Sequence, residues 1–150
     1  MMKETLVFDL PLEKVVPDER WETVEEFVIT PELNRRFMDS LEDHHPWYAE
    51  DSPYGGPIAE PGLLHEKAFM AMLRRFPIAP PEGKQSVHAK QESQFFSPPR
   101  VGAKVKIEVR LTEKYVKRGK DYVIHEARLS GEGGQIFLIS RHFRMIGEKG

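Results

Sequence analysis

The sequence has no cysteine among its 150 residues. A disulfide framework and a thiolate metal site are therefore excluded. The chain also lacks an apolar run long enough to span a membrane and a charged-then-apolar start typical of a secretion signal. We therefore expect a cytoplasmic protein that has no membrane partner.

Charge of one sign is not in excess either. The 22 lysine and arginine residues nearly balance 24 aspartates and glutamates, and the formal net charge is -2. A nucleic-acid-binding domain usually shows a basic face, so this balance argues against that class. With 39% hydrophobic and 31% charged residues, the composition is ordinary for one globular domain large enough to bury a core.

The stretch 42–76 joins an irregular loop to a helix. Its first part, 42–61, is crowded with proline, glycine, histidine, acids and aromatics, and shows no helical or strand period. From Gly62 onward, apolar residues recur every four positions and predict a helix that is buried on several sides. A long loop with ionisable groups, placed against a buried helix, is the stretch where we expect a functional site.

Strand and helix signals flank this stretch. Residues 1–20 are expected to form an arm, and residues 21–29 a strand. Thr30 and Pro31 predict the start of a helix that ends near Leu41, because they supply a capping hydroxyl and a proline at the first helical position.

The C-terminal half changes to the period of strands. Four strands are predicted, at residues 86–96, 103–113, 121–129 and 135–145. The order predicts an α+β domain over residues 21–150, in which an antiparallel sheet of about five strands wraps around a long central helix.

This order resembles the hotdog fold, and the loop is similar to that of MaoC-like hydratases and dehydratases. In that family the loop carries Asp, Asn-Pro and then His, and a second element, Ile-Ala-His-Gly, opens the helix. Here the two elements read Asp-His-His-Pro-Trp-Tyr at 43–48 and Pro-Ile-Ala-Glu-Pro-Gly at 57–62. The resemblance covers residues 21 to 146 and includes the Phe-Ser-Pro-Pro-Arg-Val-Gly run at 96–102.

The resemblance implies catalytic positions. Asp43 falls on the family's catalytic Asp, His45 on its Asn and Tyr48 on its catalytic His. Asp43 would act as the base that activates water, with His45 or Tyr48 assisting. Each of these residues also has a structural interpretation, because Asp and His often hydrogen-bond within their own loop. Of the adjacent pair His44 and His45, only the second is expected to point inward.

Two departures make the chain most similar to the N-terminal-type MaoC dehydratase domains. These are the tyrosine at the His position and the altered second element. Such domains often pair with a catalytic hotdog partner and hold the acyl chain. The resemblance therefore implies a hydro-lyase of the enoyl-CoA hydratase or 3-hydroxyacyl dehydratase type, or a non-catalytic acyl-binding subunit of a heterodimer. A hotdog acyl-CoA thioesterase is a third possibility.

Six further residues are expected to contact the substrate: Trp47, Tyr54, Ile58, Glu60, Gly62 and Glu66. Trp47 and Tyr54 are predicted wall residues, and Gly62 permits close approach to the N–H groups of the helix. Glu60 either pairs with the catalytic Asp or faces the helix dipole. Glu66 would activate water in a thioesterase, or lie at a dimer seam.

No cofactor is expected apart from coenzyme A or an acyl-carrier phosphopantetheine as part of the substrate. No nucleophile elbow, phosphate loop, dinucleotide fingerprint or metal-ligand spacing occurs. The basic run 114–120 is either a solvated turn or a contact for coenzyme A phosphates. Because a lone hotdog sheet leaves an open edge, we expect a homodimer or higher oligomer, or a heterodimer with a catalytic subunit.

Overall fold

The computed structural model describes residues 5–149. A five-stranded antiparallel sheet curves along one side of two helices, α1 (Pro31–Ser40) and α2 (Pro61–Arg75). The strands of this sheet are β2 (Asp18–Val28), β4 (Lys84–Phe95), β5 (Lys104–Lys117), β6 (Lys120–Gly131) and β7 (Ile136–Glu148). The α+β class and the number of strands in this sheet are as predicted from the sequence.

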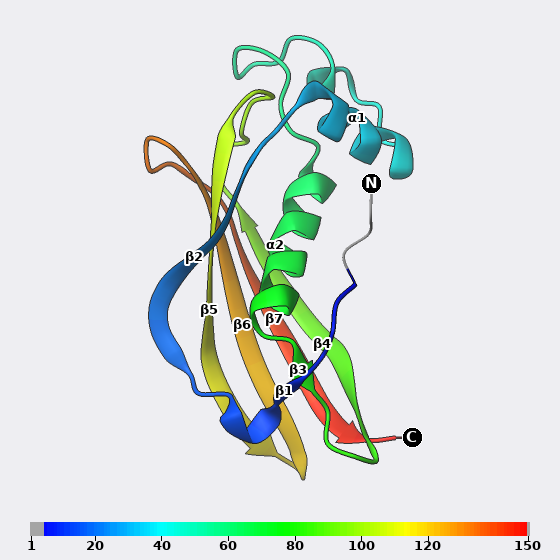
Figure 1. The fold of residues 1–150 in the computed structure, drawn as a ribbon. Helices are drawn as coiled ribbons and strands as arrows, with labels where there is room; N and C mark the ends of the chain where they lie inside the picture. The colour runs from blue at the N-terminus through cyan, green and yellow to red at the C-terminus, as the bar shows by residue number, and fades with distance from the viewer. Residues whose placement is uncertain (1–4, 150) are drawn as a thin grey trace.

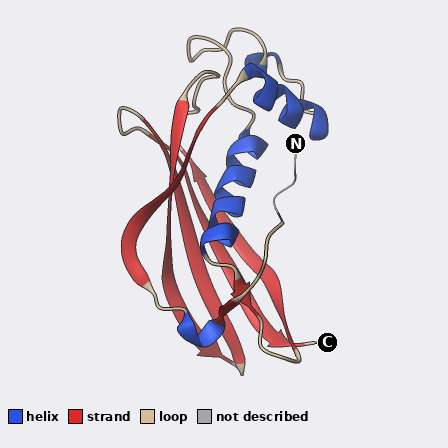
Figure 2. Ribbon diagram, in the orientation of Figure 1, coloured by secondary structure: helices blue, strands red, loops and turns tan. Residues whose placement is uncertain are grey.

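The strand order is β2-β5-β6-β7-β4. Strands β5, β6 and β7 follow one another as hairpins, whereas β4 precedes them in sequence but pairs with β7 at the far edge. The crossing places β4 and β2 at the two edges of the sheet. Both helices and the long loop between them lie together, with α1 at the end of the sheet where α2 begins (Figure 2).

Helix α1 starts as its sequence predicts. The Thr30 hydroxyl accepts the backbone N–H of Leu33 over 3.1 Å, and Pro31 occupies the first helical position. Helix α2 begins at Pro61, one residue before the predicted start, because Glu60 is its capping residue. It ends at Arg75, where Pro77 follows two residues later and cannot continue the helix.

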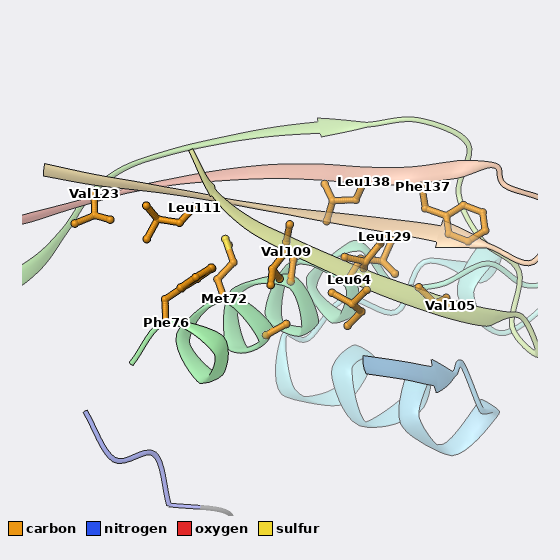
Figure 3. Packing of buried hydrophobic residues seen from close by; sticks show 14 of the residues in the cluster. Leu64, Met72, Phe76, Val105, Val109, Leu111, Val123, Leu129, Phe137 and Leu138 are labelled. Carbon is orange, nitrogen blue, oxygen red and sulfur yellow. The ribbon is translucent and has the colours of Figure 1, made fainter. Parts of the chain in front are cut away.

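The core lies between α2 and the sheet. Leu64, Met72 and Phe76 point from α2 toward the strands, as Figure 3 shows. The inward residues of β5, including Val105 and Val109, alternate with outward polar residues, so one face of the strand is buried. This packing fixes the first turn of α2 against the sheet.

Two details of the chain differ from the sequence expectation. The break expected around residues 116–120 is mostly strand: β5 runs to Lys117 and β6 begins at Lys120, so only Arg118 and Gly119 turn, both with positive φ. The expected arm is partly structured, because β1 (Leu10–Pro11) pairs in parallel with β3 (Ile78–Ala79) and β2 already begins at Asp18.

No helix among residues 5–149 is both long and apolar enough to cross a membrane.

Candidate functional site

The loop between α1 and α2 is held at both ends. The N–H of Asp43 donates to the carbonyl of Met38 over 2.9 Å, which closes the C-terminal turn of α1. Residues Pro46–Tyr48 then form one turn of 3-10 helix. Further along, the N–H of Ile58 donates to the carbonyl of Trp47 over 2.9 Å. The loop therefore folds back on itself and brings residues 43–48 beside the start of α2.

A buried amide on α1 fixes this arrangement. The Asn34 side chain is 1% exposed, and its Nδ2 donates to the carbonyls of Tyr48 and Ile58 over 3.0 and 3.1 Å. Its Oδ1 accepts the backbone N–H of Glu60 over 2.8 Å. Asn34 thus satisfies buried backbone groups from both arms of the loop.

Glu60 lies at the N-terminus of α2. Its side chain is 4% exposed, and its Oε2 accepts the N–H of Leu63 over 3.3 Å. The predicted interaction with the helix dipole is therefore present. Asp43 lies close enough for its charge to act on the Glu60 carboxyl, which is the arrangement that the predicted pairing requires.

Burial and the negative charge of Asp43 raise the pKa of Glu60, against the opposing effect of the N–H groups of Gly62 and Leu63. Two carboxyl groups in contact favour sharing one proton, and the more buried member is the better place for it. Burial and the charges of Asp43 and Glu60 also raise the pKa of Tyr48. Asp43, Tyr48 and Glu60 therefore form one interacting group, which we call the carboxyl pair and its tyrosine.

A cavity of about 500 Å³ opens beside this group. Its lining is mainly aromatic and aliphatic: His45, Trp47, Tyr48, Tyr54, Ile58, Ala59, Pro61, Leu64, Phe95, Phe96, Pro98 and Phe137. Several of the aromatic side chains at its mouth are also solvent-exposed, including Trp47, Tyr54, Phe95 and Phe96. An apolar cavity bordered by titratable groups is the usual form of a small-molecule site. We call this the acyl cavity, after the acyl chain that the sequence resemblance leads us to expect there.

The structure brings most of the sequence-predicted residues to this place. Trp47, Tyr54 and Ile58 line the acyl cavity as predicted wall residues would. His45 lines it too, while His44 turns outward and contacts Asp39 over 2.9 Å. The Nδ1 of His45 accepts the N–H of Trp47 over 3.2 Å. This is the hydrogen bond within its own loop that we expected as the alternative to a catalytic role.

Gly62 and Glu66 are placed differently from the rest. A Cβ on Gly62 would lie 2.4 Å from Leu41 Cδ1 and 2.7 Å from Glu60 Oε2, so glycine is required there for close packing. The N–H groups expected to receive a substrate oxygen face the Glu60 carboxylate instead. Glu66 is exposed and is not part of the cavity lining.

Sequence reasoning missed Asn34 and the distant wall residues. Asn34 was not singled out because polar residues on a helix usually face solvent. Its position four residues before the buried Met38 is the signal that could have revealed it, since that spacing puts both on one face of α1. Phe95 and Phe137 come from β4 and β7, and only the pairing of those strands brings them to the cavity.

The basic run 114–120 lies at the opposite end of the sheet from the loop (Figure 1). Within this chain it is therefore a hairpin tip far from the acyl cavity. Among residues 5–149, no histidine and carboxylate side chains are grouped so that they could hold a metal ion.

No protein-family model matches the sequence, and no curated protein matches it at a significant level. Solved structures do match the fold. A MaoC-like dehydratase from Rhodospirillum rubrum has a TM-score of 0.72 at 15% identity, over 95% of this chain and 99% of that one. An (R)-hydratase from A. caviae has a TM-score of 0.70 at 20% identity, over 88% and 97%.

A third similar structure is the HadBC complex of Mycobacterium tuberculosis, described as a 3R-hydroxyacyl-ACP dehydratase. Its TM-score is 0.64 at 17% identity, over 85% of this chain and 97% of that one. The expected resemblance in fold is therefore confirmed: the chain has the hotdog fold found in MaoC-like dehydratases and (R)-hydratases.

Proposed function

We propose that this chain, whose hotdog fold is that of MaoC-like dehydratases and (R)-hydratases, hydrates 2-enoyl thioesters or dehydrates 3-hydroxyacyl thioesters. The observation that supports the proposal is the electrostatic interaction of Asp43 and Glu60 with each other and with Tyr48, which lines the apolar acyl cavity. Such a pair offers a proton acceptor and a proton donor side by side, and the cavity offers space for an acyl chain.

In the hydration direction, Asp43 accepts a proton from water while the water oxygen bonds to the β-carbon of the alkene. Glu60, whose pKa is raised by burial and by the charge of Asp43, is the proton donor to the α-carbon. The proton taken up by Asp43 then returns to Glu60. The pair ends with the one proton it began with, and the reverse sequence dehydrates a 3-hydroxyacyl group.

Tyr48 serves this chemistry through its hydroxyl. Its pKa is raised from an ordinary value near 10, so it stays protonated at neutral pH and can donate a hydrogen bond to Asp43 or to the attacking water. Such a hydrogen bond would orient the water at the reacting end of the cavity. His45 lines the acyl cavity beside Tyr48, with ring centroids 5.9 Å apart, and contributes to the wall at the reacting end.

The decisive experiment measures hydration of crotonyl-CoA by the purified chain, followed as loss of the enoyl-thioester absorbance. We expect Asp43→Asn and Glu60→Gln each to lower kcat by about 10²–10⁴, the usual contribution of general acid–base catalysis. Asp39→Asn is the matched control, because Asp39 is an exposed carboxylate that contacts only the outward-facing His44. Full activity in both pair variants, in preparations free of other hydratases, would refute the proposal.

A second candidate function is an acyl-binding subunit that depends on a catalytic partner. The observation in its favour is that no histidine accompanies the carboxyl pair, since the Nδ1 of His45 is used inside its own loop. In that case the chain alone would be inactive on crotonyl-CoA but would still bind it. Thiol release without hydration would instead indicate a thioesterase, the role for which Glu66 was considered.

We also propose that the chain pairs with a second hotdog protomer, either another copy or a catalytic subunit. Strand β4 is an edge strand, and its Val87 and Phe95 are exposed together with the adjacent Phe96. An exposed apolar edge favours pairing with another strand. Light scattering that gave a mass near 17.4 kDa at micromolar concentration would contradict the homodimer.

A further inference from the structure

A second cavity, of about 520 Å³, lies farther along α2, β4 and β7 than the acyl cavity. It is also bounded by Phe8 of the N-terminal arm, a segment that runs beside α2 in Figure 1. The lining residues are Phe8, Phe69, Leu73, Pro80, Lys84, Gln85, Ser86, His88, His142, Arg144 and Lys149. The acyl cavity and the proposed hydration do not use any of them.

The notable member is Arg144, a cation that is only 6% exposed. Its guanidinium donates to uncharged acceptors, namely the Ser86 hydroxyl and the carbonyls of Phe76 and Ile78. Among the described residues it forms no ion pair with a carboxylate. Buried arginine is normally paired, because removing its charge from water without a counter-ion is costly.

The guanidinium also has unused hydrogen-bonding capacity. An arginine side chain has about five N–H donors, and the structure gives acceptors to three of them. Beside it, His142 is 2% exposed and neither of its ring nitrogens has a partner. Buried polar groups without partners are uncommon in folded proteins and indicate a missing ligand or function.

The charge and polarity of the lining define what would fit. Lys149 and Lys84 accompany Arg144, and Lys84 also lies 3.9 Å from Asp121; no aspartate or glutamate is among the described residues that line the cavity. Aromatic rings complete the lining: Phe69 stacks on His88 with ring centroids 5.6 Å apart, and Phe8 lies 5.5 Å from the Arg144 guanidinium. The cavity thus combines a cationic end with an apolar wall.

We propose that this cavity binds an amphiphilic anion, whose carboxylate or phosphate head pairs with Arg144 and whose apolar body lies against Phe8, Phe69 and Leu73. The planar guanidinium suits either head group, because its paired N–H donors match two oxygens of a carboxylate or a phosphate. The occupant supplies the missing counter-ion. The site is separate from the proposed reaction centre, so it does not depend on hydratase activity.

The test uses calorimetric titration of the full chain with octanoate, octyl phosphate and 1-octanol. We expect both anions to bind, and the uncharged octanol to bind at least about tenfold more weakly because it cannot pair with the cation. Stronger binding of octyl phosphate than of octanoate would assign a phosphate head, and the reverse a carboxylate head. In the spectrum of arginine side-chain N–H groups, the Arg144 resonance should move during the titration.

Variants separate this cavity from the acyl cavity. Arg144→Gln should weaken octanoate binding by about tenfold or more. If that variant does not fold, Phe8→Ala removes an exposed wall residue of the arm and should still weaken binding severalfold. Val116→Ala, an exposed apolar residue that lines neither cavity, is the control and should leave binding unchanged.

Three results would overturn the proposal. The first is equal binding of octanoate and octanol, and the second is normal octanoate binding in both Arg144→Gln and Phe8→Ala. The third is the absence of any binding to the wild-type chain, as expected if a second copy covers the cavity and supplies the carboxylate itself.

Discussion

The side chain of Asn34 joins α1 to the first residue before α2: its Oδ1 accepts the backbone N–H of Glu60 over 2.8 Å. The same amide donates to the carbonyls of Tyr48 and Ile58. One buried residue therefore sets the positions of both Tyr48 and Glu60. The carboxyl pair and its tyrosine depend on a residue that is not itself part of the group.

Asn34→Ala should destabilise the protein, because it leaves buried groups of Tyr48, Ile58 and Glu60 without partners. Each unsatisfied buried group costs about 1–3 kcal/mol. We expect a lower urea midpoint with an unchanged denaturant slope. Gln94→Ala serves as the control, because Gln94 carries an exposed side-chain amide, and this variant should unfold like wild type. An Asn34→Ala midpoint equal to that of wild type would mean that water replaces the amide.

The pKa of Glu60 should fall when Asp43 is replaced by asparagine. Burial, the larger cause of the raised pKa, remains in Asp43→Asn, but the negative charge of Asp43 is removed. The pKa should therefore drop toward its ordinary value and stay above it. Carbon-13 NMR of the Glu60 carboxyl in both proteins measures this change, and an unaltered titration would show that the two carboxyls do not interact.

The pH dependence of the proposed reaction follows from the same group. Glu60 must be protonated to donate to the α-carbon, so hydration should decline as pH rises through its raised pKa. Glu60→Gln would remove that alkaline limb along with most of the activity. An alkaline limb that persisted unchanged in a residual activity of Glu60→Gln would assign the titration to another group.

The parts of this site that could be predicted from the sequence are those whose residues lie close together along the chain. The loop at 43–48 and the helix that follows Glu60 are close in sequence, so residue types and spacing were enough to nominate Asp43, Tyr48 and Glu60. Glu60 was expected either beside Asp43 or at the N-terminus of α2, and the residue pattern could not choose between the two because the choice depends on the side-chain orientation.

The pairing of strands that are distant in sequence could not be predicted. The four C-terminal strands were located within a few residues, but no local pattern says that β4 pairs with β7 at the far edge. That pairing brings Phe95 and Phe137 to the acyl cavity and Ser86 to Arg144. The burial of His125 could have been predicted, since it alternates with Val123 and Ala127 on the inward face of β6.

His125 and His142 should make the protein sensitive to acid. Burial lowers the pKa of His125 to about 3 and that of His142 to about 4, with added repulsion from Arg144 and neighbouring histidines. Above pH 6.5 the unfolded chain also keeps both neutral, and stability is unaffected. Below that value the unfolded state takes up protons that the folded state excludes, so stability falls by about 1.4 kcal/mol per pH unit for each histidine.

The measurement is urea unfolding between pH 7 and about 4.5, a window set by the ordinary and the lowered pKa values. His142→Leu should flatten the loss of stability with falling pH. His44→Gln, which removes an exposed histidine, should leave the slope unchanged. Protonation of Glu60 in the folded state opposes the trend, because its pKa is raised rather than lowered. A stability that did not change over this range would rule out neutral buried histidines.

Gly62→Ala should impair the carboxyl pair more than it impairs folding. The new methyl would lie 2.7 Å from Glu60 Oε2 and 2.4 Å from Leu41 Cδ1, and the exposed Leu41 side chain can move away. The Glu60 carboxylate must then shift from its place at the α2 N-terminus. We expect turnover to fall by about tenfold or more, as for other small displacements of reacting groups. Gly133→Ala, in the turn before β7, is the control, and equal activity in both variants would contradict the prediction.

The acyl cavity should set the preferred length of the acyl chain. Leu64 is buried on α2 and lines the cavity of about 500 Å³, so Leu64→Phe replaces part of that space with an aromatic ring. We expect kcat/KM for 2-octenoyl-CoA to fall by about tenfold or more relative to crotonyl-CoA, since a few methylenes in an apolar pocket give discrimination of that order. Leu73→Phe is a matched control, because it is the same substitution on the same helix but faces the second cavity. If the chain is instead an acyl-binding subunit, the same shift should appear in the affinity for the two thioesters. A length preference that Leu64→Phe leaves unchanged, or that Leu73→Phe alters equally, would mean that the acyl chain lies elsewhere.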